Sequence, residues 1–294
     1  MTNRATETLN SWLSEPANTA RSVLVTVFGD TILPIGQGVW LSQLFQLTDE
    51  FRFSGRLVRT SLFRLAAQGW FTSERLGRQS RYSLTALAIE ESQKAEARIY
   101  RSSEPDWSGD WIVVFLDAPT VPEDVRRQLA QHLYWNGFLP LSTGIVASPS
   151  ASLTSAAELC QRVSNDVKVP LAVLKFSELD SVVADGFFSD ALQMDAANGS
   201  YTAFIDLYSG IEPVASDCEA KEAFFLRTML IHDLRRIRLS GPDFPTPLLP
   251  SDWSGAKAES LAASLYSTLS ERASPWLSEV LDTDYPAVFT ERFP

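Results

Sequence analysis

The spacing of apolar residues predicts helices near the start of the chain. Residues 20–33 are mostly apolar and predict a first helix, which Pro34 and Gly36 should end because both residues break helices. Residues 39–47 carry apolar side chains at intervals that suit a second, short helix. We expect residues 1–19 to form an N-terminal tail.

The next segment predicts a helix with two chemically different faces. Ser54 suits the N-cap position, and Gly69 suits the position just past the C-terminus. At about 100° per residue, two opposite faces emerge, one carrying Val58, Ser61, Leu62 and Leu65 and the other Arg56, Arg59, Thr60 and Arg64. Phe63 is the exception, because in a helical-wheel projection this apolar residue falls between Arg59 and Arg56. We interpret it as packing against the following hairpin or a later domain.

A hairpin and a connector should follow this helix. An aromatic strand begins near Trp70, Gly77 permits a tight reversal, and Tyr82–Leu84 belong to the second strand. An Ala- and Glu-rich helix then covers about residues 86–100. This order of elements is typical of a winged helix-turn-helix, so we predict such a DNA-binding domain with its connector helix over residues 20–100.

The remaining sequence predicts two further domains, so the expected fold class is α+β. Residues 107–180 read as strand, helix, strand, helix and strand, which favours a ferredoxin-like middle domain. Its expected elements are a strand at 111–116, a helix at 122–135, one strand within 137–147, a helix at 152–163 and a strand at 169–176. Residues 181–294 should be mainly helical, with helices at 186–197, 200–209, 217–239 and 255–272 and a proline-rich linker at 240–253.

Charge separates the first domain from the rest of the chain. The whole protein has a net charge of −11, whereas residues 51–85 contain seven arginines and one acid. Arginine suits nucleic-acid recognition because its planar fork bonds bidentately to phosphate or guanine. The candidate residues for binding double-stranded operator DNA are therefore Arg52, Arg56, Arg59, Thr60, Arg64, Arg75, Arg78 and Arg81. The alternative interpretation is a solvated helix face beside a charged hairpin.

The sequence indicates no metal centre, cofactor or disulfide framework. Cys160 and Cys218 lack CxxC spacing, and His132 and His232 are far apart. This cysteine usage suits a reducing cytoplasm. The N-terminus has no apolar core of signal-peptide type, and no run of about 18 apolar residues implies a membrane span. We therefore expect a cytoplasmic protein that does not contact the membrane.

An enzyme is the first alternative class. The chain lacks a Ser-His-Asp order, a phosphate-binding loop and paired carboxylates at mechanistic spacing, so we assign no catalytic residues. His232 and Asp233 are adjacent, and adjacent helix residues do not face each other. A nuclease built on the middle domain is the concrete form of this alternative. Asp117 ends its first strand, but an ordinary strand-end aspartate explains that residue.

The chain resembles the PaaX family of transcriptional repressors of phenylacetic acid catabolism. The resemblance rests on VTVFGDTILPIGQGVWLSQL (25–44), RLVRTSLFRLAAQGWFTSERLGRQSRYSLT (56–85), WSGDWIVVFLD (107–117) and LIHDLRRIRLSGPDFPTPLLPSDWSG (230–255). It implies a winged helix, a ferredoxin-like middle and a helical C-terminal part. It also implies a homodimer that is released from promoters by an aryl-acetyl-CoA thioester, typically phenylacetyl-CoA. The family's recognition-helix pattern falls on Arg56, Val58, Arg59, Thr60 and Arg64.

The effector site follows from this resemblance together with a second basic cluster. A CoA thioester requires basic side chains and an aromatic-lined cleft, which we place between the C-terminal helices and the middle domain. The candidates are Arg227, His232, Arg235, Arg236, Arg238 and Trp253. Family members often have an aromatic residue after the His-acidic pair, where this chain has Leu234. Alternatively, these arginines cap the helix C-terminus and pair with local acids. A DNA-bound scaffold without an effector is the second alternative function.

Overall fold

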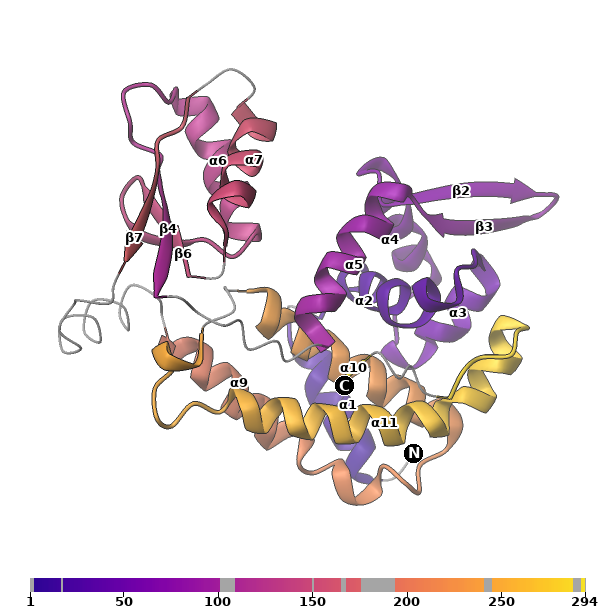
Figure 1. Ribbon diagram of the computed structural model, residues 1–294. Helices are drawn as coiled ribbons and strands as arrows, with labels where there is room; N and C mark the ends of the chain where they lie inside the picture. The colour runs from indigo at the N-terminus through magenta and orange to yellow at the C-terminus, as the bar shows by residue number, and fades with distance from the viewer. Residues whose placement is uncertain are drawn as a thin grey trace. The chain divides into compact units, whose positions relative to one another are not determined.

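The computed structural model describes residues 3–16, 18–100, 109–149, 151–164, 168–175, 194–240, 245–287 and 292–293 (Figure 1). Its residues group into two compact units that do not follow the chain in a simple order. The first unit contains residues 1–101, 203–235 and 256–294, and the second contains residues 102–202 and 236–255. The predicted DNA-binding domain and much of the predicted C-terminal domain therefore belong to one unit.

The first unit begins with a helix where the sequence suggested a tail. Helix α1 (Asn3–Ser14) buries Leu9 and Trp12. The indole nitrogen of Trp12 donates to both carboxylate oxygens of Asp233 at 3.0 Å. The expected N-terminal tail over residues 1–19 is thus largely a packed helix, because Leu9 and Trp12 belong to the core that the C-terminal helices complete.

The predicted first helix is present but is not uniform. Helix α2 (Ala20–Thr26) is capped by Thr19 and continues as a π-helical segment, η1 (Val27–Ile32), and a 3₁₀ turn, η2 (Leu33–Ile35). Gly36 then adopts a positive φ of 62° and ends the helical path. π-Helical segments are rare and often mark functional or strained positions.

A short strand precedes the second helix. Strand β1 (Val39–Trp40) pairs with β3, so helix α3 (Leu41–Thr48) starts two residues later than the sequence suggested. A 3₁₀ turn, η3 (Asp49–Phe51), then leads toward the basic helix. The pairing of β1 depends on residues some forty positions away, which local spacing does not reveal.

The basic helix follows the prediction closely. Helix α4 (Gly55–Ala67) starts after Ser54, whose hydroxyl accepts a hydrogen bond from the Leu57 amide at 3.2 Å. Its buried side chains are those of the predicted apolar face, namely Val58, Ser61, Leu62 and Leu65. Gly69 has a φ of 78°, a left-handed conformation that suits the position after a helix.

The hairpin and the connector complete the N-terminal elements. Strands β2 (Phe71–Leu76) and β3 (Gln79–Leu84) pair in antiparallel orientation around Gly77, whose φ is 64°. The sheet order is β1-β3-β2. Helix α5 (Ala86–Tyr100) has the bounds that the sequence predicted.

The second unit contains a four-stranded antiparallel sheet. Its elements are β4 (Asp110–Phe115), α6 (Glu123–Trp135), β5 (Leu139–Ser142), β6 (Ile145–Ser148), α7 (Leu153–Ser164) and β7 (Leu171–Lys175). The strand order β5-β6-β4-β7 fits a ferredoxin-like fold. One strand was expected within residues 137–147, but Gly144, with a φ of 77°, turns this segment into a hairpin. Helices α6 and α7 lie on the same face of the sheet (Figure 1).

The C-terminal helices differ from the prediction at two points. Helix α9 (Met194–Tyr208) continues through Gly199, where two helices were expected, and residues 186–193 of that prediction lie outside the described residues. Burial of Tyr201, Phe204 and Tyr208 supplies packing that outweighs the low helix propensity of glycine. Helix α10 (Ala220–Leu239) agrees with the prediction, whereas α11 (Gly255–Leu281) extends beyond residue 272 and includes Pro275. Short 3₁₀ turns, η4 (Glu212–Val214) and η5 (Thr246–Leu248), lie before and after α10 in the chain.

Candidate nucleic-acid interface

Helix α4 presents a basic face to solvent. Arg56, Arg59, Thr60 and Arg64 are all exposed, opposite the four buried residues that attach the helix to its unit. Within the described part of the chain, neither these arginines nor Arg52, Arg75, Arg78 and Arg81 form an ion pair with a carboxylate. The charge of this surface is therefore not neutralised by neighbouring carboxylates, and the choice between DNA binding and a solvated helix face beside a charged hairpin is left to experiment.

The side chain of Arg59 is held by a neighbouring ring. Its guanidinium carbon lies 4.8 Å from the centre of the Phe45 ring on α3. One of its terminal nitrogens lies 3.5 Å from the carbonyl oxygen of Gly55. Thr60 donates its hydroxyl proton to the Arg56 carbonyl oxygen at 2.9 Å. Arg59 is thus partly ordered before any ligand arrives, which reduces the entropy that binding would cost.

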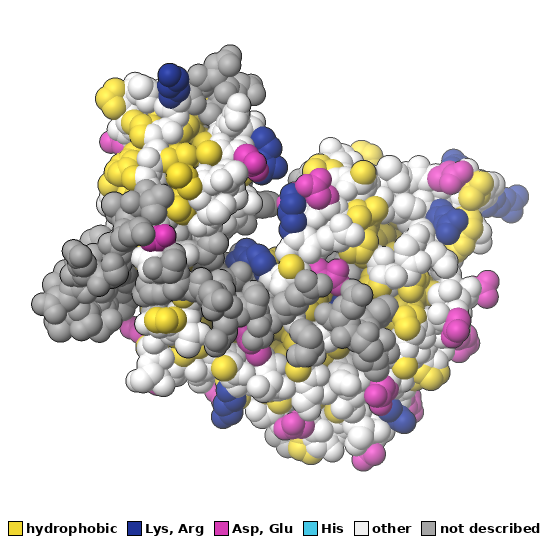
Figure 2. All heavy atoms as spheres, in the orientation of Figure 1, with side chains coloured by type: hydrophobic (Ala, Val, Ile, Leu, Met, Phe, Trp, Pro, Cys, Tyr) yellow, Lys and Arg dark blue, Asp and Glu magenta, His cyan; other side chains and the backbone are white. Residues whose placement is uncertain are grey.

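The β2–β3 hairpin carries two exposed arginines at its free end. Arg75 and Arg78 flank the turn, and the Nε of Arg75 donates to the Gly77 carbonyl oxygen at 3.3 Å. Figure 2 shows basic side chains gathered at the end of this hairpin. Arg52, also exposed, adopts a left-handed φ of 55° just before α4.

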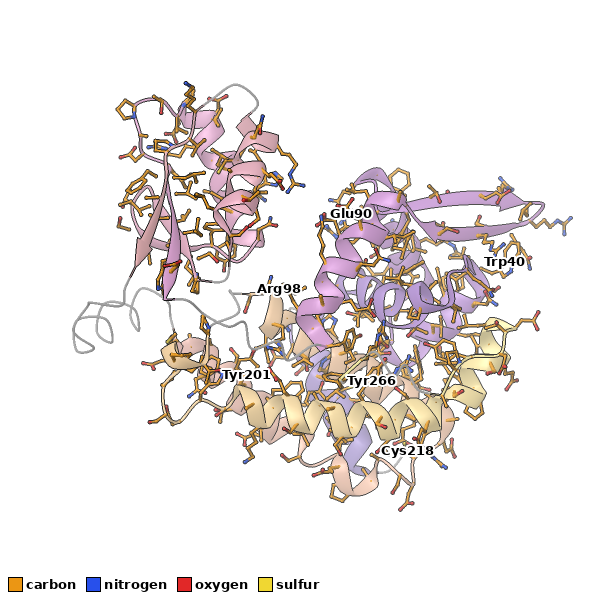
Figure 3. All side chains as sticks on the ribbon, viewed as in Figure 1. Trp40, Glu90, Arg98, Tyr201, Cys218 and Tyr266 are labelled. Carbon is orange, nitrogen blue, oxygen red and sulfur yellow. The ribbon has the colours of Figure 1, made fainter. Side chains whose placement is uncertain are left out.

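Arg81 occupies a different place from the other two hairpin arginines. It lies on β3 opposite Glu74, and its guanidinium carbon is 5.8 Å from the ring centre of Trp40 on β1. Trp40 is labelled in Figure 3. Arg81 is half-buried, so it belongs to the body of the hairpin and not to its tip.

Two of the predicted effector residues lie in the interior of the first unit. Arg227 is fully buried and pairs with Asp30 at 3.1 Å, and it also donates to the Thr31 hydroxyl at 3.0 Å. His232 is fully buried, with its Nδ1 3.2 Å from the Thr26 hydroxyl. These contacts attach α10 to the α2–η1 segment, so they do not form the accessible basic surface that the sequence suggested.

Asp30 is the centre of this internal network. Besides Arg227, its carboxylate pairs with Arg292 at 2.9 Å and accepts hydrogen bonds from the hydroxyls of Tyr100 at 2.7 Å and Tyr266 at 3.0 Å. Tyr266, labelled in Figure 3, reaches Asp30 from α11. Burial by itself raises the pKa of Asp30, but the two guanidinium groups and the two hydroxyls outweigh it and lower the pKa below its usual range.

Sequence reasoning did not identify this network. The available signal was a single acidic residue, Asp30, within the otherwise apolar helix predicted over residues 20–33. A buried carboxylate needs cationic or hydrogen-bonding partners, because an unpaired charge in the interior is costly. The identity of those partners, Arg227 and Arg292, depends on contacts between distant segments.

The other predicted effector residues are divided between the units. Arg235, in the first unit, donates to the carbonyl oxygen of Ser22 at 3.3 Å and to its hydroxyl at 3.0 Å. Arg236, Arg238 and Trp253 belong to the second unit. Arg236 is exposed, whereas the half-buried Trp253 packs its ring against Tyr201, 5.3 Å away between ring centres.

The middle domain offers no metal centre in its described part. The Asp117 carboxylate forms an ion pair with Arg126. Among the residues that the structure describes anywhere in the chain, no group of three or more His, Cys, Asp or Glu side chains is placed to hold a metal. The described helices likewise include none with the length and apolarity needed to cross a bilayer.

Comparison with known proteins identifies the family. The family models described as PaaX-like protein, PaaX protein central Cas2-like domain and PaaX-like protein C-terminal domain match residues 19–88, 104–180 and 192–279. Among curated proteins, Transcriptional repressor PaaX of Escherichia coli (strain K12) is 30% identical over 276 residues, covering 89% of this chain and 84% of the relative. The chain belongs to the PaaX family.

The matched ranges of this PaaX-family chain coincide with structural elements. The first range runs from α2 to the start of α5 and so includes α4 and the hairpin. A solved structure with a related fold is Uncharacterized protein Rv0674 from Mycobacterium tuberculosis. It has a TM-score of 0.51 and 19% sequence identity, and the match covers 87% of this chain and 97% of that one. This likeness supports the fold of the PaaX-family chain.

Proposed function

We propose that this protein is a cytoplasmic transcriptional repressor that binds double-stranded operator DNA through a winged helix-turn-helix. Helix α4 would enter the major groove, and the β2–β3 hairpin would act as the wing. The observation that carries the proposal is the division of α4 into a buried apolar face and an exposed face of arginines without carboxylate partners. The name of the Escherichia coli relative supports the repressor role.

Charge gives this assignment a physical basis. An acidic protein repels DNA at long range, so binding requires a local basic surface that overcomes the field of the whole molecule. Residues 51–85 supply such a surface with seven arginines against one glutamate, on a chain with a net charge of −11. Arginines on α4 could read guanine edges, while Arg75 and Arg78 at the hairpin tip would contact phosphates or the minor groove.

The repressor is further proposed to act as a homodimer. A single recognition helix buries too little DNA for tight specific binding, so symmetric pairing on an inverted repeat is expected. We place the dimer contacts beyond residue 100. Light scattering at micromolar concentration tests this assembly, and a strict monomer that still binds a selected duplex tightly would contradict it.

We propose that the effector is an aryl-acetyl-CoA thioester, typically phenylacetyl-CoA. The regulated genes are proposed to be those of aromatic-acid catabolism. Family membership supports this proposal. Arg227 and His232 are fully buried, whereas Arg236 is exposed, so Arg236 becomes the preferred candidate for phosphate contacts, and Arg238 and Trp253 belong to the same unit. Such a ligand must bind more tightly to a conformation that cannot hold the operator, because only differential affinity shifts an equilibrium.

The central experiment uses DNA that the protein itself selects. Duplexes enriched from a random library by the full-length protein would be labelled, and binding would be followed by fluorescence anisotropy at several salt concentrations. Enrichment of a common sequence supports the repressor assignment, whereas uniform binding to all duplexes contradicts it. Plasmid cleavage with added divalent metal would instead indicate the nuclease alternative.

Release experiments then separate a sensor from a scaffold. Phenylacetyl-CoA, acetyl-CoA and free phenylacetate would be titrated into the protein–DNA complex. Release by the aryl thioester alone supports the sensor. If no thioester binds near millimolar concentration, the protein is a DNA-bound regulator without a small-molecule effector. If release occurs but is unchanged in the Arg236→Ala variant, the effector site lies elsewhere.

A further inference from the structure

Phe63 is an exposed aromatic residue within the basic face of α4. Its exposed fraction is 74%, the highest among the exposed large hydrophobic side chains of the described residues. The sequence suggested that it packs on the hairpin or on a later domain, but the exposed ring does not pack on the hairpin of its own unit. In the described part of the chain, Phe63 has no ring contact.

The neighbours of Phe63 define the surface around it. It lies four residues after Arg59 and three after Thr60, which places all three side chains next to one another on the helix. The hydroxyl proton of Thr60 is donated to its own helix, so the outward groups of Thr60 are its methyl and the remaining acceptor capacity of its oxygen. The surface is therefore a small apolar patch that Arg59 adjoins on the same helix face.

A partner for this surface needs an apolar group at the centre and negative charge around it. A second copy of the same face does not qualify, because the arginines would repel each other. The DNA major groove has both properties: phosphates border it, and the thymine C5-methyl group is the apolar feature of its base edges. Phenylalanine and the threonine methyl are side-chain groups that contact this methyl.

We propose that Phe63 determines specificity by packing its ring on thymine methyl groups, while Arg59, held by Phe45, and Arg56 contact the adjacent bases or phosphates. This inference rests on the proposed DNA-binding function. Loss of one buried methyl group should weaken binding about fourfold, because burial of a group of that size contributes about 0.8 kcal/mol.

The test removes methyl groups from DNA one at a time. In a duplex selected by the wild-type protein, each thymine is replaced singly by deoxyuridine, which changes only the C5-methyl, and dissociation constants are measured by anisotropy. Wild type and Phe63→Ala are compared with Leu87→Ala, because Leu87 is 60% exposed on α5 of the same unit and has no expected DNA contact. Circular dichroism and Tm check that both variants remain folded.

We expect deoxyuridine to weaken wild-type binding about fourfold at one or two positions. Phe63→Ala should lose this sensitivity at those positions, and Leu87→Ala should retain it. A Phe63→Ala profile identical to that of the wild type overturns the inference, even if overall affinity falls, since the ring then contacts something other than these methyl groups. If the wild-type protein enriches no duplex at all, the proposed DNA-binding function fails instead.

Discussion

Asp30 and Arg227 form a fully buried ion pair, with 3.1 Å between the carboxylate Oδ2 and the guanidinium Nη2. Asp30 lies in the π-helical segment that follows α2, and Arg227 lies in the middle of α10. Arg292 joins the same carboxylate and also pairs with Glu96 on α5 at 2.8 Å. The network therefore ties α2–η1, the connector helix and the C-terminal helices into one unit, and it gives a structural reason why the N-terminal domain does not stand alone.

Replacement of Asp30 by asparagine should strongly destabilise the first unit. The variant leaves the buried guanidinium of Arg227 without a carboxylate and that of Arg292 with Glu96 alone, and breaking a buried ion pair typically costs about 3–5 kcal/mol. Urea unfolding followed by circular dichroism measures the change. The matched control is Asp49→Asn, because Asp49 is exposed in its ion pair with Lys221 and should lose less than about 1 kcal/mol. Equal effects of the two substitutions would contradict a central role for Asp30.

The same carboxylate should make the protein sensitive to acid. The pKa of Asp30 is lower in the folded state than the value of about 3.9 for an unfolded chain. Its stabilisation is therefore complete above the unfolded pKa and is lost as pH falls through the folded pKa. The difference in unfolding free energy between the wild type and Asp30→Asn should thus be constant near neutral pH and shrink below about pH 4. If this difference in unfolding free energy stayed constant below about pH 4, the titration of Asp30 would not be the cause of the acid sensitivity.

Arg56→Ala and Arg59→Ala should weaken specific DNA binding without unfolding the protein. Both side chains are exposed on α4, opposite its buried face, so their removal leaves the packing intact. Loss of a base-edge contact should cost about 1–3 kcal/mol, measured by anisotropy on a selected duplex. Circular dichroism supplies the folding control. Unchanged affinity in both variants would rule out α4 as the recognition helix.

The two kinds of hairpin arginine should behave differently. Arg78→Ala should lower affinity equally for selected and random duplexes, because it removes a phosphate contact at the exposed tip. The slope of log K against log salt should become shallower by about one unit, the value for one phosphate contact. Arg81→Ala should instead lower thermal stability, since that side chain packs against Trp40. A loss at Arg78 confined to the selected duplex would mean that the hairpin reads bases.

Local features of the sequence were sufficient to determine several elements. The helical-wheel pattern of α4 predicted its buried residues, Ser54 caps that helix, and α5 has the expected bounds. All of these features depend on residues within one or two helical turns. The family resemblance is likewise confirmed, because it rests on long stretches of the chain itself. Binding of DNA by α4 stays a prediction that experiment must test.

Tertiary structure decided what depends on partners distant in the chain. Helix α1 contacts α10 through the hydrogen bonds of Trp12 to Asp233, and α9 continues through Gly199 because packing outweighs local propensity. Arg227 looked like an anion-binding residue from its basic neighbours, yet Asp30 holds it in the core. Phe63 was interpreted as packing against the hairpin or a later domain, yet its side chain is exposed. Sequence patterns report the chemical character of each side chain. Burial and ion pairing depend on other residues, distant in the chain, that only the folded structure brings close.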